Sequence, residues 1–141
     1  MKTYPSNDGS AAFVSLERGE DLLDGLNRAV AELGLEAATL QVIGGLEEAK
    51  VGYYDREAKQ YLEIPTGHVE MVGLGNVSLR DGEPFIHLHL SLAGRNGTST
   101  GGHALDGCKA FVVEAYFRKL DGPAPTREEN EDIGLRVWPG R

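Results

Sequence analysis

Residues 84–94, PFIHLHLSLAG, decide the fold because apolar and polar side chains alternate along them. Successive side chains of a β-strand point to opposite faces of its sheet. One face therefore takes Ile86, Leu88, Leu90 and Leu92, and the other takes His87, His89 and Ser91. The segment predicts a strand that turns one side to a hydrophobic core and carries imidazoles on the other.

A tight turn at Asp81-Gly82 joins this strand to residues 69–79, because both turn residues tolerate positive φ. In the register set by that turn, the apolar residues of the two strands share one face. The predicted pairs are Val77 with Ile86, Gly75 with Leu88, and Met71 with Leu92. Asn76 then lies opposite His87, and Glu70 lies further along the face that carries the histidines.

A second turn, at Asn96-Gly97, returns the chain towards these histidines and brings in His103 from the segment STGGHALDG. A two-residue turn would set His103 opposite Leu90, on the wrong face for joining His87 and His89. A three-residue loop or a bulge at Gly101-Gly102 would correct the parity. Alternatively, His103 lies just beyond the strand, in a loop.

The remaining segments predict one amphipathic helix and several strands. The helix covers residues 20–33, with acidic residues in its first turn and Gly34 after its last. Strands are expected at 12–16, 38–43, 46–54, 60–64, 98–103 and 110–117, and Gly44-Gly45 is expected to break the chain between the second and third of these. The predicted fold class is α/β or α+β, with a mixed, largely antiparallel sheet flanked by helices.

The length of 141 residues predicts one compact domain over 1–141, with its core in about residues 12–120. Residues 121–141 begin as a connection rich in proline and charge. The alternation of Ile133, Leu135 and Val137 predicts an edge strand after it. Cys108, the only cysteine, is expected to be a buried filler rather than a nucleophile.

The charge of the chain argues against direct binding to nucleic acid. The formal net charge is −8, and basic residues form no cluster along the sequence. No run approaches the roughly 20 apolar residues of a membrane span, and the first residues lack the apolar centre of a secretory signal. We therefore expect neither membrane nor nucleic acid as a partner, and a cytoplasmic location.

The three histidines His87, His89 and His103 are candidate metal ligands. Three neutral imidazoles with water in the fourth position are a known zinc site, and imidazole also accepts nickel, copper or iron. The alternative is a polar pair of histidines on an exposed strand face, without metal. His68 follows Thr66-Gly67 in a predicted turn and is expected to be solvated rather than a ligand.

Several motifs, taken in order, resemble the plants and prokaryotes conserved (PPC) domain in its stand-alone form. They are Arg18-Gly19-Glu20-Asp21, Ile43-Gly44-Gly45, Val51-Gly52-Tyr53-Tyr54-Asp55, Gly67-His68-Val69-Glu70, Gly73-Leu74-Gly75-Asn76-Val77, His87-Leu88-His89, Gly101-Gly102-His103 and Glu114. Each motif is common by itself, whereas the ordered set, spread over residues 12–120, is specific. The function of this family is unknown.

The resemblance implies a homotrimer and, as in prokaryotic members, a metal ion on His87, His89 and His103. Glu70 and Glu114 match family carboxylates. With Asn76, Gly101 and Gly102, they are the residues expected around the metal, or as hydrogen-bond partners at an interface. Plant members carry an AT-hook that enters the minor groove of DNA, and this sequence has no such segment.

Three functions remain open at this stage. The first is a zinc-binding, homotrimeric binding or regulatory module that captures a small polar or anionic ligand. The second is a metal-dependent hydrolase or lyase in which Glu70 acts as general base towards a metal-bound water. The third is a metal-free interaction domain whose histidines line a subunit interface.

Overall fold

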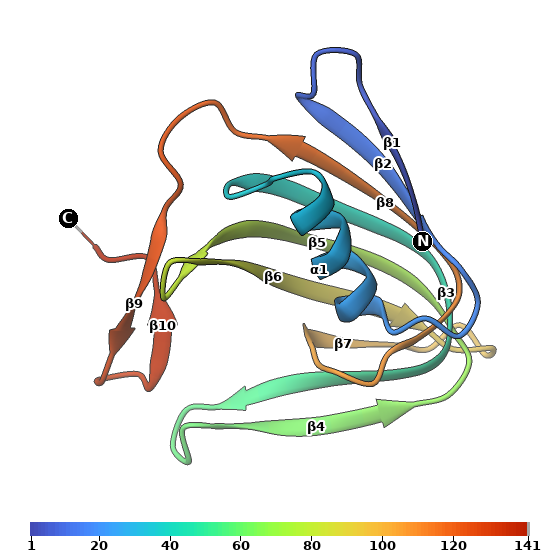
Figure 1. Cartoon of the computed structure of the whole chain (residues 1–141). Coiled ribbons are helices and arrows are strands. Elements are labelled where there is room, and N and C mark those ends of the chain that lie inside the picture. Colours follow the sequence, from blue (N-terminus) through green and yellow to red (C-terminus); the bar gives the residue numbers. More distant parts are fainter. Residues whose placement is uncertain (141) are drawn as a thin grey trace.

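The sheet is organised around β3 (Ala38–Asp55), which pairs with four other strands in the computed structural model, whose described residues are 1–140 (Figure 1). The first half of β3 lies between β8 (Lys109–Lys119) and β5 (Val69–Arg80). Its second half pairs with β4 (Gln60–Thr66) and briefly with β7 (Ser99–Ala104). The two halves of β3 thus pair with different strands of the same sheet.

The remaining strands extend this arrangement on both sides. On one side, β8 pairs with β2 (Ala11–Leu16), and β2 pairs with β1 (Lys2–Pro5). On the other, β6 (Glu83–Ala93) lies between β5 and β7. The end of β5 also pairs, in parallel, with β9 (Thr126–Asn130), which forms a hairpin with β10 (Leu135–Val137). All other pairings are antiparallel, so the predicted mixed, largely antiparallel sheet is confirmed.

The pairing of β5 with β6 has the register that the alternating sequence predicts. Val77 lies opposite Ile86, Gly75 opposite Leu88, and Met71 opposite Leu92. The apolar members of these pairs are buried in one continuous core. Burial of one face fixes the register, because a slip by one residue would turn that whole face to solvent.

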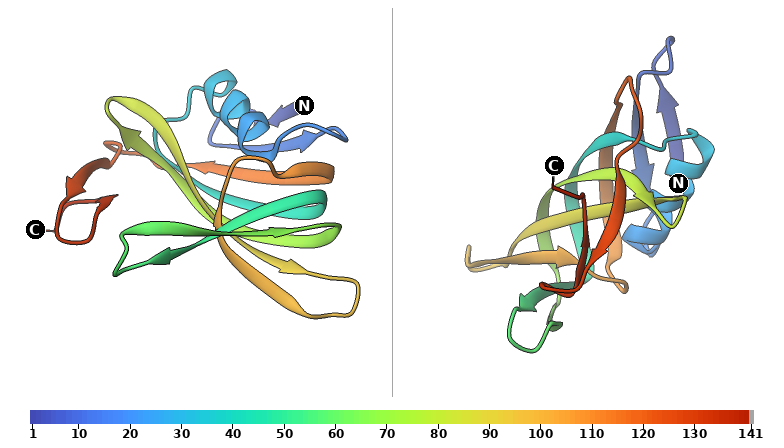
Figure 2. Two further views of the ribbon diagram at one scale, coloured as in Figure 1. Left: turned by 90° about the horizontal axis from the view of Figure 1, so that it is seen from below. Right: turned by 90° about the vertical axis from the view of Figure 1, so that its left-hand side faces the viewer.

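The helix α1 (Leu22–Glu32) covers the core face of the sheet and is the only helix within residues 1–140. The Asp21 side chain caps it by accepting hydrogen bonds from the amides of Leu23 and Asp24, at 3.1 and 3.3 Å. Leu22, Leu26, Ala29 and Val30 are buried against the strands. The flanking layer predicted as helices is therefore this one helix, which Figure 2 shows on one side of the sheet.

The sequence prediction of a chain break at Gly44-Gly45 is wrong, because β3 continues through both residues as a strand of 18 residues. The pairing of β3 with β8 shifts register twice, between Gly45 and Leu46 and between Leu46 and Glu48. Two irregularities of this kind bend a strand without ending it. They allow the second half of β3 to turn away from β8 and to pair with β4 and β7.

Two strands escaped the sequence analysis. β1 lies in the polar N-terminal residues, and β9 lies in the segment that was expected to be a connection. The predicted edge strand near the C-terminus exists as β10, but Ile133 precedes it. None of the described helices is long and apolar enough to cross a bilayer.

Gly44 supports the first of these bends and should not tolerate a side chain. Its φ is +139°, and an added Cβ would lie 2.0 Å from the carbonyl oxygen of Val112. We expect Gly44→Ala to lower the free energy of unfolding by about 3 kcal/mol or more, from strain and overpacking together. Chemical denaturation of Gly44→Ala beside Gly67→Ala, whose Cβ meets nothing within 4 Å, measures this. Equal stability of the two variants would contradict this account of the bend.

Candidate metal centre

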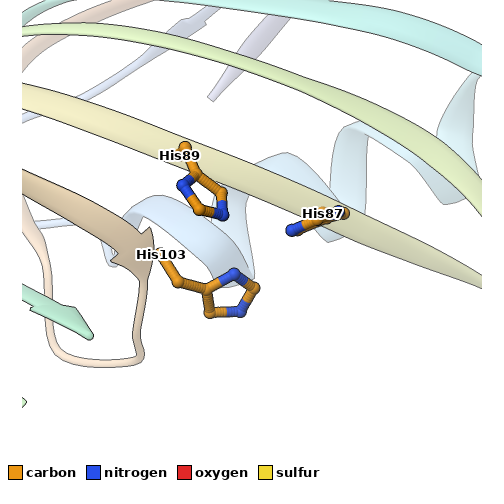
Figure 3. Close-up of side chains that lie close together, drawn as sticks. All are labelled: His87, His89 and His103. Carbon is orange, nitrogen blue, oxygen red and sulfur yellow. The ribbon is translucent and has the colours of Figure 1, made fainter. Parts of the chain in front are cut away.

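Three imidazole rings converge on one point from two neighbouring strands (Figure 3). His87 and His89 come from β6, and His103 comes from β7. The ring centroids are 5.1, 5.2 and 5.4 Å apart. One nitrogen from each ring lies within 4.8 Å of the others, so the three side chains are close enough to hold a metal ion.

The hairpin between β6 and β7 brings His103 to the correct face. Gly94 and Thr98 close a three-residue loop by a 2.9 Å hydrogen bond, and the amide of Gly97 donates to the carbonyl of Gly94. Gly97 has φ of +77°, as a loop of this length requires at its last position. The odd number of loop residues sets His103 directly opposite His89, so the loop rather than a bulge corrects the parity.

Gly101 and Gly102 serve close backbone packing instead of a bulge. Their register with β6 is continuous from Ser99 to His103. A Cβ on Gly101 would lie 2.4 Å from the Leu90 carbonyl oxygen, and one on Gly102 would lie 2.5 Å from that of Gly52. The two glycines therefore allow β7 to pass between β6 and β3 at a distance that places His103 over the site.

His103 offers a free ligand atom. Its Nδ1 is buried and has no hydrogen-bond partner among the described residues. A buried polar atom without a partner is costly and marks a position where something else binds. The ring is also held in place, because Tyr61 of β4 stacks on it with the centroids 4.9 Å apart.

Burial keeps two of the imidazoles neutral. Desolvation lowers the pKa of His87 to about 4, with Arg127 and the other histidines adding to the effect. Burial also lowers the pKa of His103 to about 4, helped by His89 and Arg127. A neutral imidazole has one nitrogen lone pair, so near neutral pH neither ring has to lose the proton of a cation before it binds a metal.

A guanidinium lies beside the histidines, and the sequence analysis did not predict it. Nη2 of Arg127 in β9 lies 3.2 Å from Nδ1 of His87 and 3.1 Å from Oδ1 of Asn76. Because arginine can only donate hydrogen bonds, Nδ1 of His87 must accept in the metal-free chain, and the proton of its neutral ring is on Nε2. A metal on this ring would displace either the Nε2 proton or the contact with Arg127. Nothing in the charged run TREEN distinguishes this arginine from a surface residue, which explains why it was missed.

The three histidines line a cavity of about 580 Å³. The hairpin of β3 and β4 supplies Tyr53, Tyr54 and Tyr61 to its wall, and the hairpin of β9 and β10 supplies Arg127 and residues 134–137. The Tyr54 hydroxyl donates to the carbonyl of Ile133 at 2.6 Å and so ties these two hairpins together. The cavity is thus lined by segments from the middle and from the C-terminal part of the chain.

Other residues predicted around the site lie in different places. Asn76 faces His87 and orients Arg127, and Gly102 lines the cavity. Glu70 lines a separate pocket with His68 and Phe111, and Glu114 is exposed between Ser15 and Ile43. Glu70 shares a sheet face with the histidines, as predicted, but lies six residues along β5 from Asn76. Strand length separates it from them.

The donor set fits a divalent transition metal. It consists of three imidazoles, two of which burial keeps neutral, and one of which, His103, has an unpartnered buried nitrogen. Imidazole suits zinc, nickel, copper and iron, whereas magnesium and calcium require oxygen ligands that these three side chains do not offer. Cys108, by contrast, is buried away from the cavity, and burial raises the pKa of its thiol, as expected for a filler.

Comparison with known proteins assigns the family. The sequence profile of the Plants and Prokaryotes Conserved (PCC) domain matches residues 4–121. The chain belongs to this family. Its function as a family is unknown, and the resemblance noted in the sequence is confirmed.

Solved structures of similar chains agree with the fold. A metal-containing protein from Archaeoglobus fulgidus is 32% identical, with a TM-score of 0.86 over 99% of this chain and 97% of its own. A plant- and prokaryote-conserved protein from Pyrococcus horikoshii is 33% identical, with a TM-score of 0.87 over 99% of this chain and 96% of its own. A Bacteroides thetaiotaomicron protein described as a candidate DNA-binding protein is 20% identical, with a TM-score of 0.88 over 97% and 96%, and shows the fold alone.

A curated relative is much longer than this chain. The bifunctional protein GlmU of a Synechococcus strain is 31% identical over 114 residues, which cover 80% of this chain. The matched region is 16% of the length of that protein.

The contact between Arg127 and His87 predicts a single tautomer for that ring. In protein freed of metal by a chelator, at neutral pH, His87 should carry its proton on Nε2 only. Long-range proton–nitrogen NMR of the imidazoles measures this, and exposed His68 should show the usual mixture of tautomers in the same spectrum. In Arg127→Met, His87 should drift towards a mixture. A proton found on Nδ1 of His87 in the parent protein would rule the contact out.

Proposed function

We propose that this chain is a metal-binding subunit of a homotrimeric binding or regulatory module, with zinc on His87, His89 and His103. The observation that carries the proposal is the convergence of three imidazoles, one of which has an unpartnered buried nitrogen. The similar Archaeoglobus fulgidus protein is described as metal-containing, which supports the same reading. When bound, the metal would supply a Lewis-acidic centre beside the cavity.

Zinc is the metal we favour among those that imidazole accepts. A site of three histidines with one position left for water is a common zinc arrangement. The zinc ion has no geometric preference from its d electrons, so the protein sets the geometry. The rings come from rigid neighbouring strands, and Tyr61 stacks on His103, so the protein fixes two ring positions before any metal arrives. Binding a small polar or anionic ligand at the open position is the role that the adjoining cavity suits.

The two other functions considered from the sequence receive less support. No carboxylate within residues 1–140 lines the cavity, so the general base that we assigned to Glu70 has no counterpart beside the histidines. A metal-free interaction domain gives no account of the unpartnered nitrogen of His103. Direct binding to nucleic acid remains disfavoured by the net charge of −8.

An exposed apolar surface on the sheet supports self-association. Phe13, Ile43, Val72, Leu74 and Val112 are each more than half exposed, at 62, 52, 58, 65 and 53%. They belong to adjacent strands, and Ile43 lies directly opposite Val72. Exposed Glu114 lies on the same face, opposite Ile43. An exposed face rich in apolar residues marks an interaction surface, and a homotrimer would cover it. Leu74 lies opposite His89, so the face reaches the histidine cluster.

The metal proposal predicts the metal content of protein prepared without an affinity tag. We expect about one zinc per chain by elemental analysis. His89→Ala should reduce this to a small fraction, because two imidazoles hold zinc far more weakly than three. His68→Ala, which removes an exposed histidine from another part of the chain, should keep the full content. Full zinc content in His89→Ala, or none in the parent protein, would refute the site.

The homotrimer predicts a mass three times the 15.2 kDa of one chain in light scattering during size-exclusion chromatography. Val72→Lys should shift the population to monomer, because a charge in the centre of an apolar interface is costly to bury. Leu62→Lys, which changes a 46% exposed leucine on β4, is the matched control and should remain trimeric. A parent protein of single-chain mass would exclude the trimer.

A further inference from the structure

We propose that the cavity beside the three histidines binds a small organic oxyanion, with Arg127 as the residue that holds its charged headgroup. The headgroup is a carboxylate or a phosphate, and the body is flat and apolar. This inference extends the proposed function. It rests on that function in one respect only, namely that the proposed metal would contact the same headgroup. The argument depends on the charge, the walls and the hydrogen bonds of the cavity.

Arg127 is a buried cation without a counter-ion. Its residue is 9% exposed, and no carboxylate of the described residues forms an ion pair with it. Its partners are all neutral: the Ser78 hydroxyl, the Asn76 amide oxygen, the Arg136 carbonyl and the His87 ring. Buried charges in proteins are normally paired, so an unpaired guanidinium in a cavity wall predicts an anionic ligand.

The charge of the cavity is opposite to that of the chain. The chain carries a net charge of −8, yet the residues that line this cavity include Arg80, Arg127 and Arg136 and, within residues 1–140, no aspartate or glutamate. Arg136 is paired with Asp81, which leaves Arg80 and Arg127 as the charges available to a ligand. A cationic recess on an acidic protein attracts small anions and repels large polyanions from its surroundings.

Arg127 is positioned in advance and keeps one donor free. Nε donates to Ser78 at 3.0 Å, Nη2 is used by Asn76 and His87, and Nη1 makes one long contact of 3.4 Å with the Arg136 carbonyl. A guanidinium has five N–H groups, so one hydrogen on Nη1 has no partner. A side chain fixed in this way loses little entropy when a ligand arrives.

The walls favour an organic ligand over an inorganic ion. Phe85, Tyr53 and Tyr61 line the cavity, and Arg80 lies over the Phe85 ring at 4.2 Å. Arg127 lies 5.4 Å from the same ring. Aromatic walls offer stacking area that a bare phosphate or sulfate does not use. A volume of about 580 Å³ is within the usual range for small-molecule sites.

Arg127 and one wall of the cavity come from a part of the chain beyond the family match. The family profile ends at residue 121, whereas Arg127 and the cavity wall at 134–137 belong to the β9–β10 hairpin. This hairpin is fixed to the site by the Tyr54 hydroxyl and by Lys59, whose Nζ donates to the Glu131 carbonyl at 2.7 Å. The proposed anion site therefore depends on this C-terminal hairpin, which lies outside the residues matched by the family profile.

Benzoate is the probe for the test, with benzamide as its uncharged isostere. On full-length zinc-loaded protein, calorimetry and ligand-observed NMR should detect benzoate and show at least tenfold weaker binding of benzamide. Acetate should bind more weakly than benzoate if the aromatic walls contribute. Phenyl phosphate compared with benzoate tests which headgroup the site prefers, and inorganic phosphate compared with phenyl phosphate tests the contribution of the aromatic walls. Equal affinity for benzoate and benzamide would overturn the proposal.

The variant test uses Arg127→Met, which keeps the length of the stem and removes the charge. Its affinity for benzoate, compared with that of the parent protein when both are saturated with zinc, should fall at least tenfold, and Arg95→Met, in the exposed β6–β7 loop, should match the parent protein. Benzoate should also shift the guanidinium resonances of Arg127 in the parent protein, which tests the contact even if Arg127→Met does not fold. Unshifted resonances, or an unweakened folded variant, would refute the role of Arg127.

Failure of this inference and failure of the proposed function are distinguishable. Zinc held at full content without benzoate binding would refute the anion site and leave the metal site standing. Benzoate binding that depends on Arg127 in a protein that holds no zinc would support the anion site and refute the metal proposal.

Discussion

The pairing of His103 with His89 across the β6–β7 hairpin is the constraint on which the rest of the site depends. Side chains alternate along both strands, so the number of residues in the connecting loop decides whether the third imidazole joins the other two or turns into the core. Three loop residues, with Gly97 in the left-handed region, give the joining parity. Gly101 and Gly102 then let the returning strand pass close to β6 and β3.

A second constraint is electrostatic. His87 and His103 are kept neutral by burial, which lowers the pKa of both, and a guanidinium lies in contact with His87. A positive charge beside a metal site is unfavourable unless negative charge is present as well. A bound anion would offset the repulsion between the metal and the guanidinium, and a bound metal would add attraction for the anion. The two ligands are therefore expected to bind cooperatively. The acidic remainder of the chain lies outside the recess and leaves this local balance intact.

The outer face of the sheet connects the site to the assembly. Leu74 is 65% exposed and lies opposite His89, so the apolar face and the histidine cluster are continuous. The β9–β10 hairpin lines the cavity on another side and lies apart from α1 in Figure 1. The metal ligands and the apolar face thus both lie within the residues matched by the family profile, while Arg127 and the β9–β10 hairpin lie after them.

The sequence by itself determined the local pattern: the strand with alternating leucine and histidine, the register of β5 with β6, and the capped helix. These follow from the period of the hydrophobic residues and from turn residues whose effect is local. The sequence left open how His103 reaches the face of the other histidines. A three-residue loop and a bulge at Gly101-Gly102 would both achieve this, and the sequence is compatible with either. Only the tertiary structure decided that β3 bends through Gly44 instead of ending, that Glu70 lies far from the histidines, and that Arg127 lies among them. Those outcomes depend on which distant strands pack together, and the burial of a charge or the continuation of a strand is set by that packing, which no local pattern encodes.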